Sequence, residues 1–404
     1  MDSFIPTKAQ AERIAAEYGT PVFVTDAGML RARAKSMLAA FDWPKTKILY
    51  AIKANSNPAL VRELKAAGIH GVDAVSVHEV RLARDLGFAP DDIVFTGSNP
   101  STDEIRTVTE QGVLLNAGSL SEVKRFGELF PGQKIALRIN PGVGAGHHAK
   151  TTTGGETSKF GIVRADFAAA KELLQKYGLA LAGIHSHVGS GFSTPDEFLA
   201  SVRLVLEEAA DFPELEFVDF GGGFAVPYRP EQNAIDLEGF GAATKALLES
   251  FSEQNGKQIE MRIEPGRYLV AESTALLTRV TTVKPSAGRL FVGTDTGMHH
   301  LIRPAMYDAY HHVVNVSDPN GEVVKADVVG NVCESSDFFG RDLEVTEPRE
   351  GDLLAILTAG AYGSVMSSNY NLQPMAAEVL LDDGAIRLTR RRQSYEQMLE
   401  DFVR

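Results

Sequence analysis

Apolar runs and helix-like segments alternate along much of this chain. Eight runs of mostly apolar residues lie at positions 48–53, 71–76, 92–97, 113–117, 134–140, 181–187, 217–220 and 261–264. Short runs of this kind between turn residues are typical of strands that are buried on both faces, as in parallel sheets. Eight successive strand–helix units predict an α/β fold, a (β/α)8 barrel. A doubly wound sheet is the competing prediction, because sequence does not show the order of the strands.

Start and stop signals support the intervening helices. Four Ser or Thr residues stand three positions before a glutamate, in the pattern of a capping box: Ser76, Ser101, Ser119 and Thr194. Three glycines stand where helices would end in a left-handed residue: Gly68, Gly87 and Gly112. These signals predict helices between the strands, as a barrel requires.

The pattern changes beyond about residue 275. Alternating, β-branched runs occupy positions 276–283, 289–295, 322–329 and 353–358, and two further runs flank Asp382-Asp383-Gly384, a strong hairpin signal. The run 21–24 also looks like a strand and is expected to join this part. We therefore expect a (β/α)8 barrel at residues 30–275 followed by a mainly β domain, sandwich-like or barrel-like, built from residues 1–29 and 276–404.

Length, charge and cysteine count narrow the class of protein. The 404 residues are too many for one small core, and a net charge of −13 argues against nucleic acid or an anionic membrane as partner. No apolar run approaches the roughly 18 residues of a membrane helix, and residues 1–19 lack the apolar stretch of a secretory signal. The single cysteine, Cys333, excludes an internal disulfide and fits a reducing compartment. We expect a cytoplasmic protein that binds neither nucleic acid nor membrane.

Side chains that suit catalysis gather at the predicted carboxyl ends of the barrel strands. In chain order these are Lys53, Asp73, Arg138, the segment 185–190, the glycines 221–223 and the segment 264–267. In (β/α)8 barrels the active site lies at that end. A lysine alone in this position would more often be a structural cation paired with a carboxylate, but the other residues at the strand ends favour a catalytic role for Lys53.

The glycines of the seventh strand end indicate a phosphate site. Gly221, Gly222 and Gly223 let backbone N–H groups approach a phosphate closely, and Ser190 and Arg267 add a donor and a charge. A glycine triplet alone is more often a tight turn. The position of this one, beside an arginine after the eighth strand, favours phosphate, because barrels commonly use these two loops for it.

A phosphate site, a lysine, a histidine and a carboxylate together describe a site for pyridoxal 5′-phosphate. Lys53 would hold the aldehyde as a Schiff base, which requires a neutral amine and hence a depressed pKa. Glu264 would pair with the pyridine nitrogen and keep the ring cationic, and His187 would lie over the ring face. His185 and His187 also have the spacing of a metal pair, but no third ligand follows at suitable spacing, so we expect no metal.

The chain resembles the fold-type III pyridoxal-phosphate decarboxylases at a series of motifs. In order they are YAIKAN, LRINPG, KTTTGGETSKFGI, GIHSHVGSG, GGGFAVPY, EPGR, RPAMYDAYHH, CESSD and GAYGSVMSSNYN, and they cover nearly the whole chain. The resemblance implies an alanine-racemase-like barrel and a β domain that contributes substrate and dimer contacts. It also implies a homodimer whose active sites are completed across the interface.

Carried over residue by residue, the resemblance assigns roles at the site. It implies Lys53 as the Schiff-base lysine and His187 as the ring-stacking residue. The expected cofactor contacts are Asp73, Arg138, Ser190, Gly222, Gly223, Glu264, Gly266, Arg267 and Tyr362. Cys333 and Glu334 would come from the partner subunit, the first near the substrate Cα to assist protonation and the second at its distal end. Cys333 as a small core residue is the alternative.

The resemblance is strongest to members that act on meso-diaminopimelate, which carries a carboxylate and an ammonium at its unreactive centre. Arg303 and Tyr307, with Arg267 and Tyr362, would hold that carboxylate, while Glu334 takes the ammonium. The product would be L-lysine, in the last step of its biosynthesis.

Other functions stay open at this point. The alternatives are a decarboxylase acting on ornithine, arginine or carboxynorspermidine, an amino-acid racemase of the same fold, and a non-catalytic pyridoxal-phosphate carrier. Leu372-Gln373-Pro374 departs from the Ser-Arg-Pro common among relatives and removes a positive charge near the site. Residues 144–157, rich in Gly and Thr, would be a mobile cover over the site or a plain surface loop.

Overall fold

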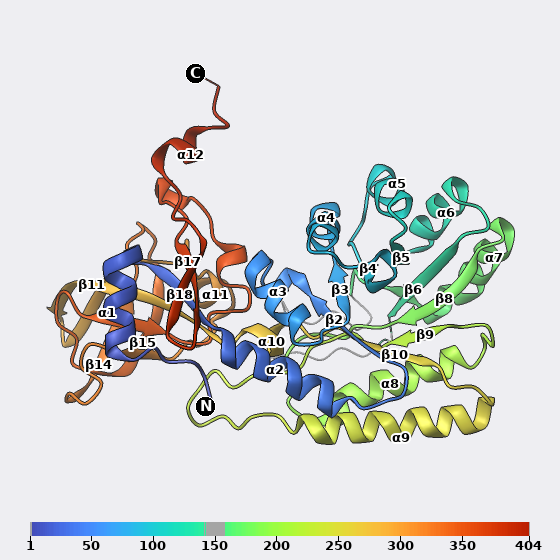
Figure 1. Cartoon of the computed structure of the whole chain (residues 1–404), viewed down its shortest axis with the longest axis horizontal. Coiled ribbons are helices and arrows are strands. Elements are labelled where there is room, and N and C mark those ends of the chain that lie inside the picture. Colours follow the sequence, from blue (N-terminus) through green and yellow to red (C-terminus); the bar gives the residue numbers. More distant parts are fainter. Residues whose placement is uncertain (1, 141, 143–157, 404) are drawn as a thin grey trace.

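The computed structural model describes residues 2–140, 142 and 158–403. Two bodies lie side by side, a barrel and a mixed β-sheet with short helices (Figure 1). Residues 144–157, expected to form a mobile cover or a plain surface loop, lie outside the described residues, so that prediction stays a prediction. Among the described helices, none is both long enough and apolar enough to cross a membrane.

Eight parallel strands close into the predicted barrel. They are β2 (Thr46–Ala51), β3 (Gly71–Ala74), β4 (Ile93–Phe95), β5 (Leu114–Ala117), β6 (Lys134–Asn140), β8 (Ala180–His185), β9 (Phe217–Asp219) and β10 (Glu260–Ile263). Their order is β5-β4-β3-β2-β10-β9-β8-β6, and β5 also pairs with β6. This pairing removes both sheet edges, so the doubly wound alternative is wrong. A two-residue strand, β7 (Ile162–Val163), adds to β6.

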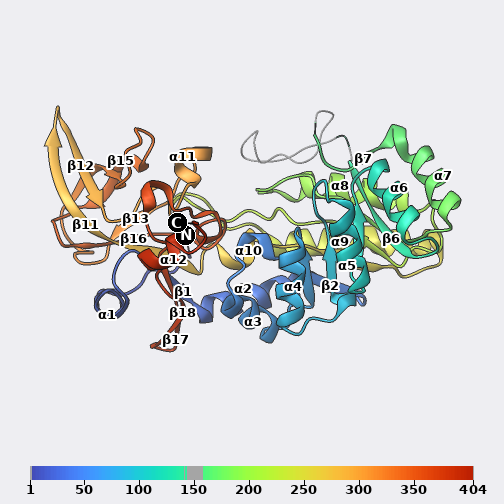
Figure 2. The ribbon, with the colours of Figure 1, turned by 90° about the horizontal axis from the view of Figure 1, so that it is seen from above.

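Helices cover the outside of the barrel (Figure 2). They are α2 (Ala27–Ala40), α3 (Pro58–Ala66), α4 (Val77–Asp85), α5 (Thr102–Glu110), α6 (Leu120–Leu129), α7 (Phe167–Tyr177), α8 (Pro195–Ala209) and α9 (Leu237–Asn255), with 3-10 turns η1 (Ile52–Ala54), η2 (Pro90–Asp92) and η4 (Arg164–Asp166). The apolar faces of the helices and the strands form one continuous core, in which residues such as Leu30, Leu60, Phe126 and Phe198 are fully buried. The packing of this core holds the strands and helices in place, and with them the side chains at the strand ends.

The predicted helix signals are confirmed in part. Ser101 forms a complete capping box. At Ser76 and Ser119 the hydroxyl accepts a hydrogen bond from the backbone N–H of the glutamate three residues on, as predicted. The glutamate carboxylate, however, accepts from the N–H of the residue before the serine rather than from the serine itself. Thr194 makes no side-chain cap, so that prediction is wrong; Pro195, whose missing N–H costs nothing in the first turn, starts the helix instead. All three predicted helix-ending glycines have positive φ: Gly68, Gly87 and Gly112.

The second body is a mixed sheet. Its strands are β1 (Val22–Asp26), β11 (Thr274–Ser286), β12 (Arg289–Thr294), β13 (Val313–Asn315), β14 (Val323–Val329), β15 (Phe338–Thr346), β16 (Leu353–Ile356), β17 (Ala377–Asp382) and β18 (Ala385–Arg390). Strand β1 lies between β11 and β17, so the run near the N-terminus joins this sheet as expected. Asp383 and Gly384 both have positive φ, as the predicted two-residue hairpin turn needs.

Short helices complete the second body. They are α1 (Lys8–Tyr18), α11 (Arg303–Tyr307), α12 (Tyr395–Leu399), η5 (Ser364–Met366) and η6 (Tyr370–Leu372), whereas α10 (Arg267–Val270) packs into the core of the barrel. Strand β1 leads directly into α2 of the barrel, and the chain returns from the barrel through α10 into β11. These two crossings bring α10 and α11 to the carboxyl ends of the barrel strands, where the two bodies meet (Figure 1).

Candidate active site

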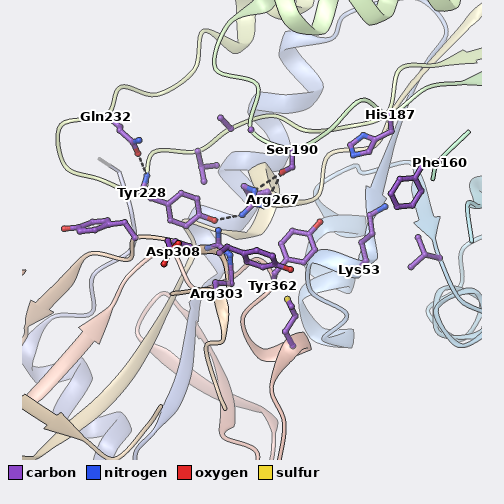
Figure 3. Close-up of a pocket in the computed structure, with 18 of the residues that line it drawn as sticks. Lys53, Phe160, His187, Ser190, Tyr228, Gln232, Arg267, Arg303, Asp308 and Tyr362 are labelled. Atoms are coloured by element: carbon purple, nitrogen blue, oxygen red, sulfur yellow. Dashed lines mark hydrogen bonds between the residues drawn. The ribbon is translucent and has the colours of Figure 1, made fainter. Parts of the chain in front are cut away.

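A cavity of about 690 Å³ lies where the carboxyl ends of the barrel strands face the second body (Figure 3). Eight of the predicted site residues line it: Lys53, Arg138, His187, Ser190, Arg267, Arg303, Tyr307 and Tyr362. They come from four barrel strand ends and from two segments of the second body. The structure thus brings together side chains that are spread over about 310 residues of sequence.

Lys53 stands in η1, which follows β2 directly, so it lies at the strand end as predicted, although β2 itself stops at Ala51. Its Nζ donates to Oδ2 of Asp73, a fully buried residue on β3, at 2.5 Å. Burial alone would lower the pKa of Lys53, but the carboxylates of Asp73 and Glu264 outweigh it, so the pKa is raised. The predicted depressed pKa is therefore wrong, because sequence did not reveal that two carboxylates would lie this close.

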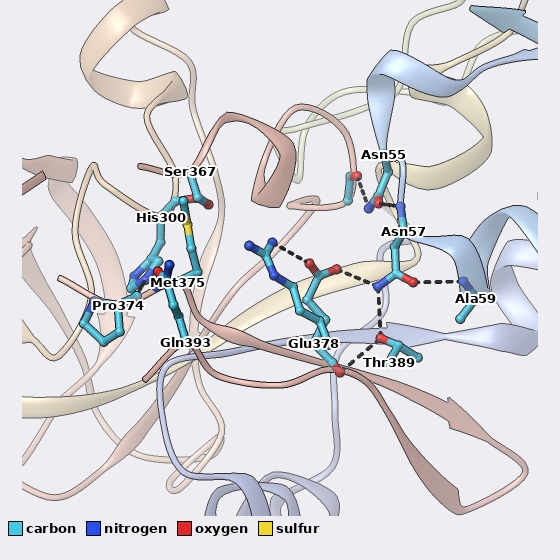
Figure 4. A network of polar contacts seen from close by, with 12 residues as sticks. Asn55, Asn57, Ala59, His300, Ser367, Pro374, Met375, Glu378, Thr389 and Gln393 are labelled. Atoms are coloured by element: carbon cyan, nitrogen blue, oxygen red, sulfur yellow. Dashed lines mark hydrogen bonds and ion pairs between the residues drawn. The ribbon is translucent and has the colours of Figure 1, made fainter. Parts of the chain in front are cut away.

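The second body fixes the segment that carries Lys53 (Figure 4). Asn55 donates through Nδ2 to the carbonyl oxygen of Gly360 at 3.0 Å, and the Tyr362 N–H donates to that of Ala54 at 2.8 Å. Two residues on, Asn57 donates to Oε2 of Glu378 at 2.9 Å. Lys53 is thus held by both bodies.

Glu264 ends β10 inside the barrel with an unsatisfied oxygen. His185 Nε2 lies 3.0 Å from Oε2 of Glu264, whereas Oε1 is buried and has no hydrogen-bond partner among the described residues. Burial, followed by the charge of Asp73, raises the pKa of Glu264 to about 8, and burial lowers that of His185 to about 4. A carboxylate in this place needs a nearby cation, which a protonated pyridine ring supplies.

The two histidines of the His-x-His pair face different surroundings. His185 points into the barrel, where His185, Asp219 and Glu264 each offer one ligand atom within 4.8 Å of the others. The expectation that no further ligand lies near the pair is therefore wrong for His185, since barrel closure brings distant carboxylates to it. His187 lines the cavity beside Lys53, and its Nδ1 accepts the Gly222 N–H at 3.1 Å. Burial holds the pKa of His187 well below its usual range, so its ring is neutral.

The glycine loop after β9 leaves no room for side chains. A Cβ on Gly222 would lie 2.1 Å from the carbonyl oxygen of Glu264, and one on Gly223, whose φ is +111°, would lie 2.3 Å from that of Gly189. Such close backbone approach is the arrangement that a phosphate cradle needs. Gly266 precedes α10 and lies against Ala51 and Ala54 of the Lys53 segment.

Arg267 lies beside this loop. Its Nε and Nη2 donate to Ser190 Oγ at 3.3 and 3.2 Å, and its Nη1 donates to Tyr228 Oη at 2.7 Å. Its guanidinium also lies 5.2 Å from the ring centre of Tyr362. The arginine that the sequence placed at a phosphate therefore does lie against Ser190 and Tyr362.

The far side of the cavity belongs to Arg303 on α11. Its guanidinium lies 4.6 Å from the ring centre of Tyr228 and donates through Nη1 to His311 Nε2 at 2.9 Å. Tyr228 and His311 were not predicted. Both lie within quoted motifs, but no strand-end rule points to them, because Tyr228 is well beyond β9 in the long loop before α9 and His311 lies between α11 and β13 of the second body.

The residues present fit pyridoxal phosphate: an amine, a buried acid with an orphaned oxygen, a neutral histidine, and a glycine loop beside an arginine. The model of the pyridoxal binding domain of the pyridoxal-dependent decarboxylases matches residues 27–271. The diaminopimelate decarboxylase of Methanothermobacter thermautotrophicus is 41% identical over 97% of this chain and 93% of its own length. The chain belongs to the diaminopimelate decarboxylase family.

Solved structures of the family agree in fold. A diaminopimelate decarboxylase crystal structure superimposes with a TM-score of 0.91 at 38% identity, covering 98% of this chain and 97% of the other. That of Helicobacter pylori complexed with L-lysine gives 0.89 at 32% identity, covering 96% and 98%. The predicted barrel and mainly β domain are therefore those of this family, and the β domain is a mixed sheet.

Two predicted residues of this family site lie away from the cavity. Cys333 and Glu334 follow β14, and neither lines the cavity of its own chain. Cys333 is exposed and its Sγ lies 3.4 Å from Oδ1 of Asn371, so the alternative of a core cysteine is wrong. Glu334 accepts a hydrogen bond from the hydroxyl of Tyr370.

Proposed function

We propose that this protein decarboxylates meso-2,6-diaminopimelate to L-lysine and CO2 with pyridoxal phosphate held on Lys53, as the last step of lysine biosynthesis. The observation that carries the substrate assignment is Arg303, only 7% exposed, at the end of the cavity away from Lys53. A buried guanidinium needs an anionic partner, and the distal carboxylate of diaminopimelate supplies one.

The residues divide the work of the reaction. When bound, pyridoxal phosphate takes up the electron pair left as the bond between Cα and the departing carboxylate breaks. Lys53 would hold the cofactor through Nζ. Glu264 would hold a proton at the pyridine nitrogen, and neutral His187 would lie against the ring. Ser190 and Arg267, with the glycine loop, would bind the phosphate.

A second subunit completes the site in this proposal. Cys333 and Glu334 are exposed and sit beside two exposed apolar side chains, Tyr370 and Leu372. Such a patch supports contact with a second copy. Cys333 would then protonate Cα after CO2 leaves, and Glu334 would bind the distal ammonium of the substrate. The division of the chain into a barrel at 30–275 and a β domain from 1–29 and 276–404 belongs to the same proposal, as does a cytoplasmic protein that binds no nucleic acid.

Assay of the purified, cofactor-loaded protein for CO2 release tests the reaction. We expect turnover of meso-diaminopimelate and much weaker turnover of ornithine, arginine or carboxynorspermidine, each of which leaves Arg303 buried without a carboxylate. A preference for one of these would overturn the substrate assignment. Absence of turnover with all of them would favour a non-catalytic carrier.

Mixing two inactive variants tests the shared site. Lys53→Ala and Cys333→Ala each lack one half of a site that spans two chains. Subunit exchange between them gives heterodimers with one intact site each, so activity returns to roughly a quarter of the wild-type value. Mixtures that stay inactive, although mass measurements show exchanged dimers, would contradict sites shared between chains.

A further inference from the structure

Two arginines reach the cavity without a carboxylate partner in the described part of the chain. Arg267 donates to the hydroxyls of Ser190 and Tyr228, and Arg303 donates to the imidazole of His311. All these partners are uncharged, while both guanidinium groups lie in the cavity wall. In the proposed site the cofactor phosphate would pair with Arg267, so the charge of Arg303, at the end of the cavity away from Lys53, is left for another ligand (Figure 3).

Some arginines outside the cavity are paired with carboxylates, whereas others, such as Arg84 and Arg125, donate to backbone carbonyl oxygens. Arg289 is paired with Asp327 at 2.6 Å and with Asp342 at 3.2 Å, and Arg31 is paired with Asp382 at 2.6 Å. These arginines are partly exposed, so they need compensation less than Arg303 does. The absence of a carboxylate beside the more buried Arg303 thus points to a charge reserved for a ligand.

The geometry of His311 fixes its protonation state. Its Nδ1 lies 2.9 Å from the carbonyl oxygen of Leu357, which can only accept, so Nδ1 carries the proton. Nε2 is then a lone-pair acceptor, and Arg303 Nη1 donates to it at 2.9 Å. His311 is fully buried and its ring meets that of Tyr228 edge-on at 5.3 Å. Burial and the neighbouring guanidinium lower the pKa of His311 to about 3, so it stays neutral.

We propose that His311 is a positioning residue for substrate selection, a neutral acceptor that fixes the Arg303 guanidinium in the cavity wall and leaves its charge for a carboxylate on the substrate. This inference rests on the proposed function. A carboxylate in place of His311 would hold Arg303 equally well but would cancel its charge. The neutrality of the acceptor, and not only its hydrogen bond, therefore selects a dicarboxylic amino acid.

A matched pair of variants separates charge from shape. His311→Gln and His311→Glu both place an acceptor near the position of Nε2, and they differ only in charge. With cofactor-loaded protein we expect His311→Gln to keep the KM for meso-diaminopimelate within roughly threefold of wild type. His311→Glu should raise it roughly 10- to 100-fold, the size of a lost charged hydrogen bond. Since neither variant touches the Lys53 end, the cofactor dissociation constant should stay the same.

1,5-Diaminopentane supplies the second readout, because it has the carbon chain of the product L-lysine but lacks the distal carboxylate that L-lysine keeps. Its inhibition constant should change less than roughly threefold in His311→Glu, or fall, since Arg303 is then neutralised. Should His311→Glu fail to fold, His311→Leu removes the acceptor without adding charge and should raise KM at least roughly tenfold at unchanged cofactor affinity.

Three outcomes would count against the proposal. Equal KM values for the Gln and Glu variants would overturn the role of neutrality, and an unchanged KM in His311→Leu would overturn positioning. A parallel rise in the inhibition constant of 1,5-diaminopentane would indicate general damage rather than a lost carboxylate site. Wild-type protein that releases no CO2 from meso-diaminopimelate would overturn the proposed function itself, a result distinct from these.

Discussion

Asn57 joins the Lys53 segment to the second body, and its replacement by aspartate gives a sharp test of that junction. Its Oδ1 accepts the Ala59 N–H at 3.0 Å and caps α3, while its Nδ2 donates to Glu378 Oε2 at 2.9 Å and to Thr389 Oγ1 at 3.0 Å (Figure 4). Asparagine and aspartate are equally good caps. Judged by the helix alone, Asn57→Asp should therefore be neutral.

The hydrogen bonds of Asn57 to the second body predict instead that Asn57→Asp destabilises the protein. The substitution removes a donor to a buried carboxylate, at about 1.5–3 kcal/mol. It also places a second carboxylate beside that of Glu378. The repulsion between two carboxylates is about 5 kcal/mol at 3 Å and an effective dielectric constant near 20, unless the pair takes up a proton. Arg390, 3.1 Å from the other oxygen of Glu378, relieves part of this. We expect Asn57→Asp to lose about 3–5 kcal/mol of stability and Asn57→Ala, which loses cap and donor without repulsion, about 2–3 kcal/mol.

Denaturant unfolding of the cofactor-loaded protein measures these changes. The single tryptophan, Trp43, is buried in the barrel and reports its unfolding by fluorescence, with circular dichroism as a second probe. Ser101→Asp, at the exposed cap of α5, is the matched control and should change stability by less than about 0.5 kcal/mol.

Acid provides an internal check on the cause. Repulsion raises the folded-state pKa of the two carboxyls in Asn57→Asp above their unfolded values. The penalty is therefore present at high pH and is lost as pH falls through the raised pKa, when the pair shares a proton. The Asn57→Ala penalty has no such pH dependence. An Asn57→Asp protein as stable as wild type, or more stable than Asn57→Ala at neutral pH, would refute the reasoning.

Three further predictions concern the cofactor end of the cavity. Gly222→Ala puts a Cβ against the Glu264 backbone and should weaken cofactor binding at least roughly tenfold by equilibrium titration, whereas Gly293→Ala, whose Cβ meets nothing nearer than 3.5 Å, should bind normally. Equal affinities would contradict the tight loop. Asp73→Asn removes the main charge that raises the pKa of Lys53 and leaves burial, which lowers it, so the neutral amine forms at lower pH. Cofactor reloading at neutral pH should then be faster and its pH profile shifted downward; an unchanged profile would show that Asp73 does not hold the ammonium. Glu264→Gln should keep the cofactor but lower kcat by roughly 100-fold or more, since an amide does not hold the ring proton, and near-normal kcat would remove Glu264 from the chemistry.

Local sequence patterns predicted most of the barrel, because each buried strand is a short apolar run and several helices have their own start signals. Strands β13 and β15 were missed. Residues 338–346 of β15 alternate weakly and carry exposed charged side chains, so their strand state depends on pairing with β14 rather than on their own pattern. The first predicted run extends to Lys53 although β2 stops at Ala51, because an apolar run does not show where the chain turns into η1.

The site residues could be predicted where they stand at the ends of barrel strands, and not elsewhere. Residues at strand ends converge by symmetry of the barrel, so the positions of Arg138, His187 and Arg267 followed from the fold. His311 and Tyr228 reach the cavity through contacts between the two bodies, which no local pattern encodes. The pKa of Lys53 depends on its burial and on how close the neighbouring charges lie, and the sequence shows the residue types but not these distances.

The central claim is that Lys53 carries the cofactor, and the most direct measurement locates it. The purified protein is treated with borohydride, which makes the carbon–nitrogen link to pyridoxal phosphate permanent, then digested and analysed by mass spectrometry. The account predicts one modified peptide, containing Lys53, and a Lys53→Ala protein that loses both the modification and CO2 release. Modification of a different lysine, or turnover retained by Lys53→Ala, would contradict it.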